Sequence, residues 1–292
     1  MTKILLKDIS MAADGSVWAI DKAESKIHRL IGDAGFIDFV PDRLGYGESV
    51  TATDMGGCFT VNKDGEIWQL RGGEMYLEGE WTKVETYSGQ NDAKSVVYAG
   101  TPWYIQNDDV IMRPSSNVGA SFWMPAGNGK GVSVAPLTDS RFEAFCVNQA
   151  GEIWKYDGRA TWSKIGGYRG RDDAKMIAAG SDNSVGYVSK TGSVYRYTGS
   201  GWAPEASAGA NLLQNIELIS ISNKENMWCL DAEGVAYHLW ENKWSKFVGR
   251  QGYTEWHYTV KEGDHLRQIV INEFGLTTDA EIRQRGNNIA SA

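Results

Sequence analysis

The sequence predicts an all-β fold: a six-bladed β-propeller of four-stranded antiparallel blades, followed by a small C-terminal strand-helix-helix segment. Three observations predict it. One hairpin phrase recurs six times, short strands flank the copies, and the 292 residues are rich in Gly (34), Trp (12) and Tyr (13) but contain only 6 Pro. Such a composition favours short strands joined by tight turns, and tandem modules of about 40 residues are typical of propellers.

The recurring phrase is a β-hairpin. Its fullest copies are "CFTVNKDGEIWQL" (58–70) and "AFCVNQAGEIWKY" (144–156), in which apolar and polar residues alternate and the turn ends in glycine. Alternation of period two marks strands, and glycine readily adopts the positive φ of such a turn. The other copies cover 16–30, 102–114, 185–197 and 227–239, and one position recurs every 40 to 44 residues at His28, Trp68, Met112, Trp154, Tyr195 and Tyr237.

Two further strands flank each hairpin. A short strand precedes it, as in "KDISMA" (7–12) and "KMIAAG" (175–180), and a strand that opens with an aromatic residue follows it, as in "WTKV" at 81 and "WSKI" at 162. Four short strands cannot bury their own apolar faces, so neighbouring blades must pack face to face. We expect the propeller to occupy 1–250, with blades near 4–41, 47–86, 93–126, 130–167, 174–205 and 214–249.

Side-chain packing is expected to close the ring. All four strands of the first and last blades come from contiguous sequence, so no strand is shared between them, and Ile4, Leu5 and Leu6 are available to reinforce the closure. The strand tryptophans are expected to fill blade interfaces in preference to stacking on sugars, because each buries a large apolar surface. These are Trp68, Trp81, Trp154, Trp162 and Trp244.

The repeat unit resembles the tectonin repeat. The fullest matches are "ADGSVWAID" (13–21), "VNKDGEIW" with "WTKV", and "VNQAGEIW" with "WSKIGG", and the resemblance covers most of the chain. Tectonin propellers are typically lectins that bind glycans or lipopolysaccharide, or modules of larger assemblies. The resemblance therefore implies binding and not catalysis, although a fold alone does not fix a function.

The segment 256–292 differs from the repeats. "YTVKEGD" predicts a strand and a turn, Asp264 is placed to cap a helix, and "TTDAE" contains a capping box that begins a second helix. The order resembles a LysM module, which implies binding of N-acetylglucosamine polymers such as peptidoglycan or chitin. The residues matched to that module are Gly263, Asp264, His265, Asn287 and Asn288.

Two departures from the LysM pattern leave alternatives open. The final strand of the module is missing, and His265 stands where a small hydroxyl residue is usual. The segment is either degenerate or is completed by a strand from a protein partner. We weigh sugar binding against a docking role, as in a phage-tail-like contractile particle.

Composition and motifs argue against several other classes. The net charge is −8 and there is no basic cluster, which disfavours nucleic acid and anionic membranes, and no apolar run is long enough for membrane insertion. The sequence contains no enzyme motif, and we expect no metal or cofactor, with the cysteines buried as small apolar residues. No signal peptide is recognised, which predicts synthesis in the cytoplasm and extracellular action after lysis or on a released particle.

The best candidates for a glycan site are two matching inter-blade loops, "TYSGQNDAKSV" (86–96) and "GYRGRDDAKMI" (167–177). Both offer an aromatic ring and planar polar groups, which sugar recognition requires, and two arginines in the second loop suit a phosphate or a sugar acid. The alternative is that both are simply well-made turns. The residues are Tyr87, Asn91, Asp92, Tyr168, Arg169, Arg171, Asp172 and Asp173.

Overall fold

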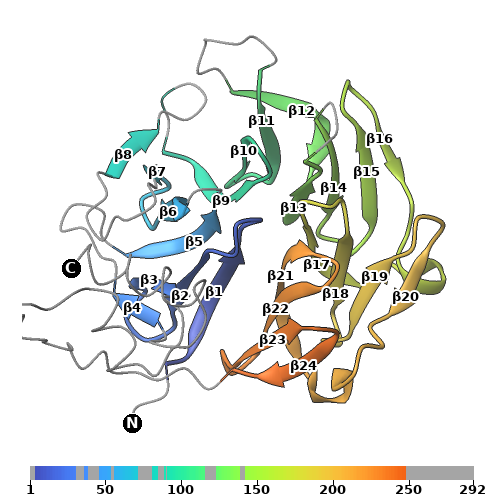
Figure 1. Ribbon diagram of the computed structural model, residues 1–292. Helices are drawn as coiled ribbons and strands as arrows, with labels where there is room; N and C mark the ends of the chain where they lie inside the picture. The colour runs from blue at the N-terminus through green and yellow to red at the C-terminus, as the bar shows by residue number, and fades with distance from the viewer. Residues whose placement is uncertain are drawn as a thin grey trace, which may run out of the picture.

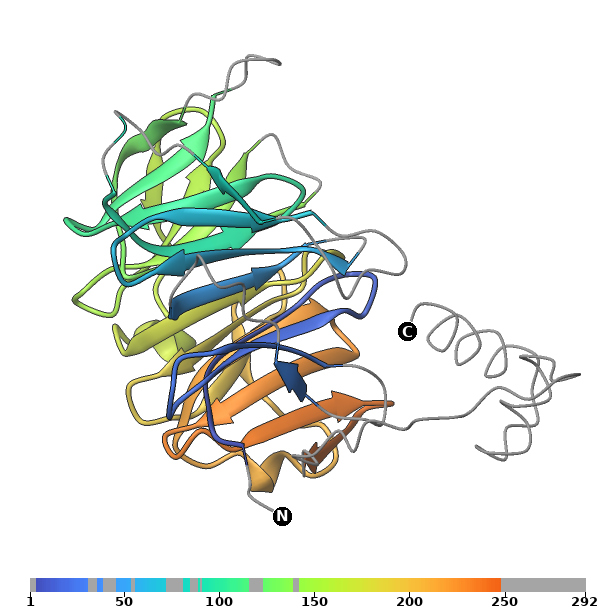
Figure 2. The same ribbon diagram turned by 90° about the vertical axis from the view of Figure 1, so that its left-hand side faces the viewer.

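The chain forms a six-bladed propeller with a β-sheet of four antiparallel strands in each blade. This computed structural model describes residues 4–30, 36–38, 46–53, 56–71, 81–84, 89, 91–115, 123–138 and 142–247. Figure 1 shows the six sheets arranged around a common centre, and in the view of Figure 2 the strands run across the thickness of the disc. The predicted fold class is confirmed.

Each blade is built from four strands that are consecutive in sequence. Blades 1 to 3 comprise β1 (Leu6–Met11), β2 (Val17–Asp21), β3 (Ile27–Leu30) and β4 (Phe36–Asp38); β5 (Gly47–Ala52), β6 (Cys58–Asn62), β7 (Ile67–Leu70) and β8 (Trp81–Val84); and β9 (Ala93–Tyr98), β10 (Pro102–Gln106), β11 (Val110–Pro114) and β12 (Trp123–Lys130). Blades 4 to 6 comprise β13 (Ser133–Pro136), β14 (Glu143–Val147), β15 (Ile153–Asp157) and β16 (Trp162–Lys164); β17 (Ala174–Ala179), β18 (Val185–Ser189), β19 (Val194–Tyr197) and β20 (Trp202–Pro204); and β21 (Ile216–Asn223), β22 (Asn226–Asp231), β23 (Ala236–Trp240) and β24 (Lys243–Lys246). Two short 3-10 turns, η4 (Tyr168–Gly170) and η5 (Ala210–Leu212), lie between blades.

The first strand of each blade lies innermost, so β1, β5, β9, β13, β17 and β21 contact one another around the centre (Figure 1). Several of their edge amides donate to side chains of the preceding blade, and unpaired amides on an edge strand are costly. Ser10 Oγ accepts from Ala52 N at 2.9 Å, and Ser220 Oγ accepts from Met11 N at 2.9 Å. Small hydroxyl residues on inner strands therefore link one blade to the next.

A second link between blades repeats six times around the ring. The residue at the end of each hairpin turn has a positive φ, and its carbonyl accepts the amide at the start of the next blade's inner strand. Gly65 O accepts from Ala93 N at 3.1 Å, and Gly234 O accepts from Leu6 N at 2.9 Å, which closes the ring. The six residues are Ser25, Gly65, Asp109, Gly151, Gly192 and Gly234.

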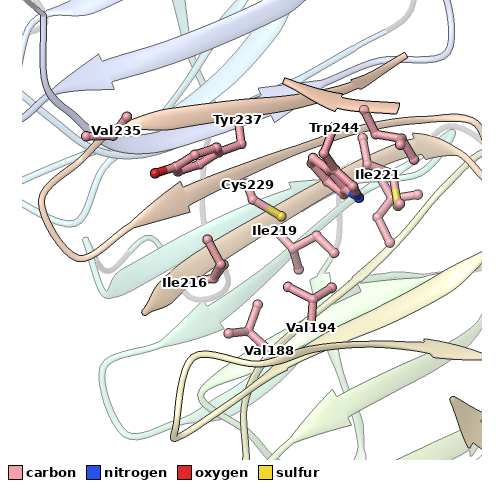
Figure 3. Packing of buried hydrophobic residues seen from close by; sticks show 11 residues of the cluster. Val188, Val194, Ile216, Ile219, Ile221, Cys229, Val235, Tyr237 and Trp244 are labelled. Carbon is pink, nitrogen blue, oxygen red and sulfur yellow. The ribbon is translucent and has the colours of Figure 1, made fainter. Parts of the chain in front are cut away.

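The hydrophobic core is divided among the blade interfaces. Figure 3 shows the interface of blades 5 and 6, where Val188 and Val194 of blade 5 face Ile216 and Ile219 of blade 6. The closing interface packs Leu6 and Ile9 of blade 1 with residues of β22 and β23, without a shared strand. The ring therefore closes through side-chain packing and backbone hydrogen bonds, as the sequence predicted.

The predicted packing of the strand tryptophans at blade interfaces is confirmed. Trp244 is buried in the interface of blades 5 and 6, while the other four pack against the clusters between blades 1 and 2 or blades 3 and 4. The sequence prediction missed three tryptophans that are as deeply buried as Trp244 and lie on the second strand of their blades. They are Trp18, Trp103 and Trp228, each 1% exposed or less.

Candidate functional site

The hairpin turns and the inter-blade loops emerge on the same face of the disc in blades 2 and 4. A Cβ added to Gly65 would lie 2.5 Å from the carbonyl oxygen of Asn91, and one added to Gly151 would lie 2.7 Å from that of Asp172. Both glycines also have a positive φ, of 75° and 90°, which favours glycine there for a second reason. Each candidate loop is therefore held directly against the turn of its own blade.

A polar cluster lies beside this contact in blade 4. Glu152 Oε2 accepts hydrogen bonds from Asn148 Nδ2 at 2.6 Å and from the indole nitrogen of Trp154 at 3.2 Å. Its other oxygen, Oε1, accepts from Lys164 Nζ at 2.6 Å, and the same ammonium donates to Asp172 Oδ2 at 2.8 Å. We call this arrangement the Glu-Trp-Lys cluster of blade 4.

Blade 2 repeats the cluster at equivalent positions. Glu66 Oε2 accepts from Asn62 Nδ2 at 2.9 Å and from the indole nitrogen of Trp68 at 3.1 Å. Its Oε1 accepts from Lys83 Nζ at 2.5 Å and from Asn91 Nδ2 at 3.4 Å. Asn91 thus occupies the place that Asp172 holds in blade 4, so the two clusters differ by one negative charge.

Within each cluster, the oppositely charged groups stabilise one another in their ionised forms. The ammonium of Lys164, together with Asn148, lowers the pKa of Glu152, and the carboxylates of Asp172 and Glu152 raise the pKa of Lys164. Hydrogen bonding by Lys83 lowers the pKa of Glu66 in the same way. Glu66, Glu152 and Lys164 are therefore charged near neutral pH. The side chain of Lys164 is 39% exposed, so the cluster faces solvent and its contribution to stability is small.

Next to the blade 4 cluster, the loop forms the turn η4 and presents two arginines. Tyr168 is half-buried and stacks on Tyr195 with ring centroids 5.0 Å apart, and the guanidinium of Arg169 lies 5.0 Å from the Tyr168 ring centroid. Arg169 has a φ of 57°, while Arg171 and Asp172 are exposed. Tyr168 therefore serves partly as packing, and Arg169, Arg171 and Asp172 are the solvent-facing groups of this loop.

The acidic residues Asp92 and Asp173 have a structural role. The carbonyl oxygen of Asp92 accepts from Asn107 N at 2.9 Å and its Oδ2 accepts from Gln106 Nε2 at 2.5 Å, while burial raises the pKa of its carboxyl. The carbonyl of Asp173 likewise accepts from Lys190 N at 2.6 Å. Both residues hold the loop to the following blade.

Some predicted residues lie outside the described ranges. These are Tyr87 and the whole LysM-like segment 256–292, which contains Gly263, Asp264, His265, Asn287 and Asn288. Conversely, the sequence prediction named neither the glutamates nor the lysines of the clusters. The recurring "GEIW" and "W-x-K" phrases contain them, but their meeting depends on strand register, because Trp154 pairs with Lys164 and Trp68 with Lys83.

No group of three or more His, Cys, Asp or Glu in the described ranges is placed to hold a metal ion. Cys58, Cys146 and Cys229 are buried and unpaired, as the sequence predicted. Within the same ranges, no helix is long and apolar enough to cross a membrane.

Comparison with protein families gives a match to the Tectonin domain over residues 6–232. This range takes in the strands of blades 1 to 5 and continues into blade 6. No curated protein matches the sequence.

Several solved structures share the fold. Virginiamycin B lyase from Staphylococcus aureus superposes with a TM-score of 0.56 at 14% identity, covering 86% of this chain and 88% of that one. YCF48 from Cyanidioschyzon merolae gives 0.51 at 12%, covering 86% and 88%. PorZ of the type-IX secretion system of Porphyromonas gingivalis gives 0.55 at 12%, covering 85% of this chain, which spans only 33% of PorZ. At such identities the likeness concerns the fold alone.

Proposed function

We propose that this chain, which belongs to the tectonin domain family, is a carbohydrate-binding protein and not an enzyme. The proposed ligands are microbial surface glycans, with lipopolysaccharide, peptidoglycan and chitin-like polymers as the classes to test. The proposed sites are the Glu-Trp-Lys clusters of blades 2 and 4 with the inter-blade loops beside them.

The observation that carries the proposal is the repetition of one solvent-facing cluster on two blades. Sugar recognition combines an apolar ring face with a few well-placed polar groups. Trp68 and Trp154 are half-buried, each donates its indole N–H to a carboxylate, and each has a lysine as its cross-strand partner. Lys164 has three N–H donors and two of them bond to Glu152 and Asp172, which leaves one for a ligand oxygen.

Two clusters on one face fit a multivalent ligand. A single shallow site of this kind is expected to bind with a Kd between about 1 mM and 1 μM, roughly −4 to −8 kcal/mol. A repetitive cell-surface polymer engages both sites together, which raises the overall affinity without any new contact. We therefore expect binding to polymers or cell walls to exceed binding to the corresponding monosaccharide.

The blade 4 site is expected to favour an acidic glycan. Arg169 and Arg171 are exposed beside the cluster, and guanidinium groups bind phosphate and carboxylate through paired hydrogen bonds. In the sequence of the blade 2 loop the equivalent residues are Ser88 and Gln90, which are uncharged and lie outside the described ranges. The two sites thus differ in charge, and phosphorylated sugars such as those of lipopolysaccharide are the first candidates for blade 4.

The test is glycan-array and cell-wall binding by the purified chain and two double variants, E66Q/K83M and E152Q/K164M. Each variant removes a carboxylate and its ammonium together, so no buried charge is left unpaired. We expect each to weaken binding by about tenfold, because losing a hydrogen-bonded pair of charged contacts costs on the order of 1.4 kcal/mol. The matched control is K155M, since Lys155 neighbours Trp154 but pairs with Glu143 instead.

Binding that is unchanged in both double variants, with a normal melting temperature, would exclude the clusters as the glycan site. Absence of binding to any glycan or cell-wall preparation, together with a stoichiometric protein partner on purification, would favour the assembly role instead. The assembly role depends on residues 256–292. A variant truncated after residue 250 should therefore lose the protein partner if the assembly role holds, and should still bind glycan if the chain is a lectin.

A further inference from the structure

A pocket of about 610 Å³ lies between blades 5 and 6. Its apolar wall includes Val185, Ile221 and Met227, and its rim includes Arg196, Glu205 and Lys224. Val185 begins β18, and the opposite end of this strand leads into the hairpin turn at Gly192. The pocket therefore opens away from the face that carries the hairpin turns, and the inference drawn from it is independent of the glycan proposal.

The interface of blades 5 and 6, where the pocket lies, lacks the large aromatic side chain that the other five interfaces receive from the second strand of a blade. In each of the other five blades, the second or third residue of the second strand is aromatic and packs against the next blade: Trp18, Phe59, Trp103, Phe145 and Trp228. Strand pairing places Gly186 at this position in blade 5, because Gly186 pairs with Arg196 as Trp18 pairs with Arg29.

The residues around the pocket are the counterparts of those around Trp18. Trp18 packs in one cluster with Ala52 and Cys58, which are paired residues on the first two strands of the next blade. The equivalent pair in blade 6 is Ile221 and Met227, and both line the pocket. A Cβ on Gly186 would lie 3.0 Å from Ile221 Cδ1, so this isoleucine fills part of the vacant ring position. Figure 3 shows Ile221 at this interface, beside Trp244.

Arg196 is a cation whose partner ring is absent. In three other blades, the strand partner of the repeated aromatic residue lies over its ring. Arg29 Cζ is 5.6 Å from the Trp18 ring centroid, Lys155 Nζ is 5.9 Å from that of Phe145, and the rings of His238 and Trp228 stack at 4.4 Å. Arg196 has the same position on its strand, but glycine stands where the ring would be, and its guanidinium lines the pocket instead.

The hydrogen bonds of Arg196 indicate what the pocket selects. Its Nε donates to Glu205, Nη1 donates to the carbonyl oxygen of Lys224 at 2.6 Å, and Nη2 lies 3.5 Å from Ser207 Oγ. The side chain of Glu205 is only 3% exposed and neutralises the charge at close range. A ligand carboxylate or phosphate gains little at such an engaged guanidinium, whereas the face of a neutral aromatic ring can still stack on it.

We propose that this pocket binds a planar aromatic ring, of indole or phenol type, in the place that a Trp or Phe of the chain itself occupies at the other five interfaces. The ring packs against Ile221 and Met227 and stacks on Arg196. Its source is either a free aromatic molecule or an aromatic side chain presented by a peptide, and the test separates the two.

The test titrates the full chain, with 13C-labelled methionine and isoleucine methyl groups, against indole, N-acetyltryptophanamide and methyl glucoside. We expect saturable shifts of the Met227 Cε and Ile221 Cδ1 signals with the aromatic probes and none with the glucoside. Binding of both aromatic probes indicates a site open to free molecules, whereas binding of N-acetyltryptophanamide alone indicates a ring presented on a peptide backbone.

Two variants make the test specific. G186W/I221A restores the arrangement of Trp18 with Ala52 and should abolish the Met227 shift, because the chain's own indole fills the pocket. R196Q/E205Q removes the cation together with its buried carboxylate and should weaken binding of the aromatic probes about threefold to tenfold. If G186W/I221A fails to fold, R196Q/E205Q still tests the site. E152Q/K164M, on the other face, should leave the shifts unchanged.

The inference is overturned if neither aromatic probe shifts the two methyl signals at millimolar concentration, or if methyl glucoside shifts them as strongly. It is also overturned if folded G186W/I221A still binds the probes with unchanged affinity. None of these results bears on the glycan proposal, which is tested separately by glycan-array binding of the cluster variants.

Discussion

Ring closure at Gly234 gives the sharpest test of the fold. Gly234 has a φ of 88°, and a Cβ added there would lie 2.4 Å from Leu6 O and 2.9 Å from Leu6 N, the amide that donates to Gly234 O. In G234A the positive φ costs about 1 kcal/mol, and disruption of the hydrogen bond and the adjacent packing costs about 2 kcal/mol more. We expect G234A to lower the free energy of unfolding by about 3 kcal/mol.

A matched control separates backbone strain from ring closure. Gly15 has a φ of 85°, but a Cβ there meets no atom within 4 Å, so G15A pays only the cost of the conformation. For a domain of this size, the difference of about 2 kcal/mol lowers the melting temperature by about 4–8 °C, which circular dichroism resolves. The same link between blades recurs at Gly151. Because the ring is closed, we expect G151A to lower the melting temperature by as much as G234A does.

Equal melting temperatures for G234A and G15A would refute the reasoning, because the Leu6 contact would then contribute nothing to stability. A loss in G151A but not in G234A would mean that the ring is held at its internal interfaces and not at the junction of blades 6 and 1.

Three other perturbations test the packing and the charges. W103A should lose about 3–5 kcal/mol in chemical denaturation because Trp103 is 1% exposed between blades 3 and 4, whereas W240A, at a 56% exposed residue, should lose less than about 0.5 kcal/mol. Burial raises the pKa of Asp8 from 3.8 to about 7, although its oxygens accept from Val50 N and Ile9 N. The folded state binds this proton more tightly than the unfolded state, so protonation of Asp8 stabilises the fold fully below a pH of about 4, and this stabilisation is lost as the pH rises through about 7. The D8N variant should therefore flatten the plot of melting temperature against pH over that range. An unchanged slope would contradict the assignment to Asp8. Burial also raises the pKa of the three thiols, so a thiol reagent should modify them only as fast as the chain unfolds, and rapid labelling of the native protein would count against burial at Cys58, Cys146 and Cys229.

Much of the fold is predictable from sequence because the sequence motif of one blade recurs six times. The turn glycines, the alternating strands and the aromatic-led outer strands recur at a nearly constant interval, and one repeat explains the next. The burial of Cys58, Cys146 and Cys229, and the closure of the ring without a shared strand, also follow from strand patterning and strand order.

The candidate site was predictable only in part. The sequence pointed to the loops that contain Asn91 and Asp172, and these residues do join the clusters. It gave no means of separating Asp172, which faces solvent and Lys164, from its neighbour Asp173, whose backbone holds the next blade. Adjacent residues in a loop point in different directions, and only the tertiary contacts decide which direction each one takes.

The sequence by itself determined how many blades form, where the strands and turns fall, and which side chains alternate toward the interfaces, because these depend on local periodicity. Only the tertiary structure decided how residues of different strands and blades meet. The pairing of Glu152 with Lys164 follows from strand register, and the pocket at Gly186 exists because the facing residues of blade 6 leave the ring position incompletely filled. Such contacts depend on side-chain volumes summed across an interface, which no single repeat contains.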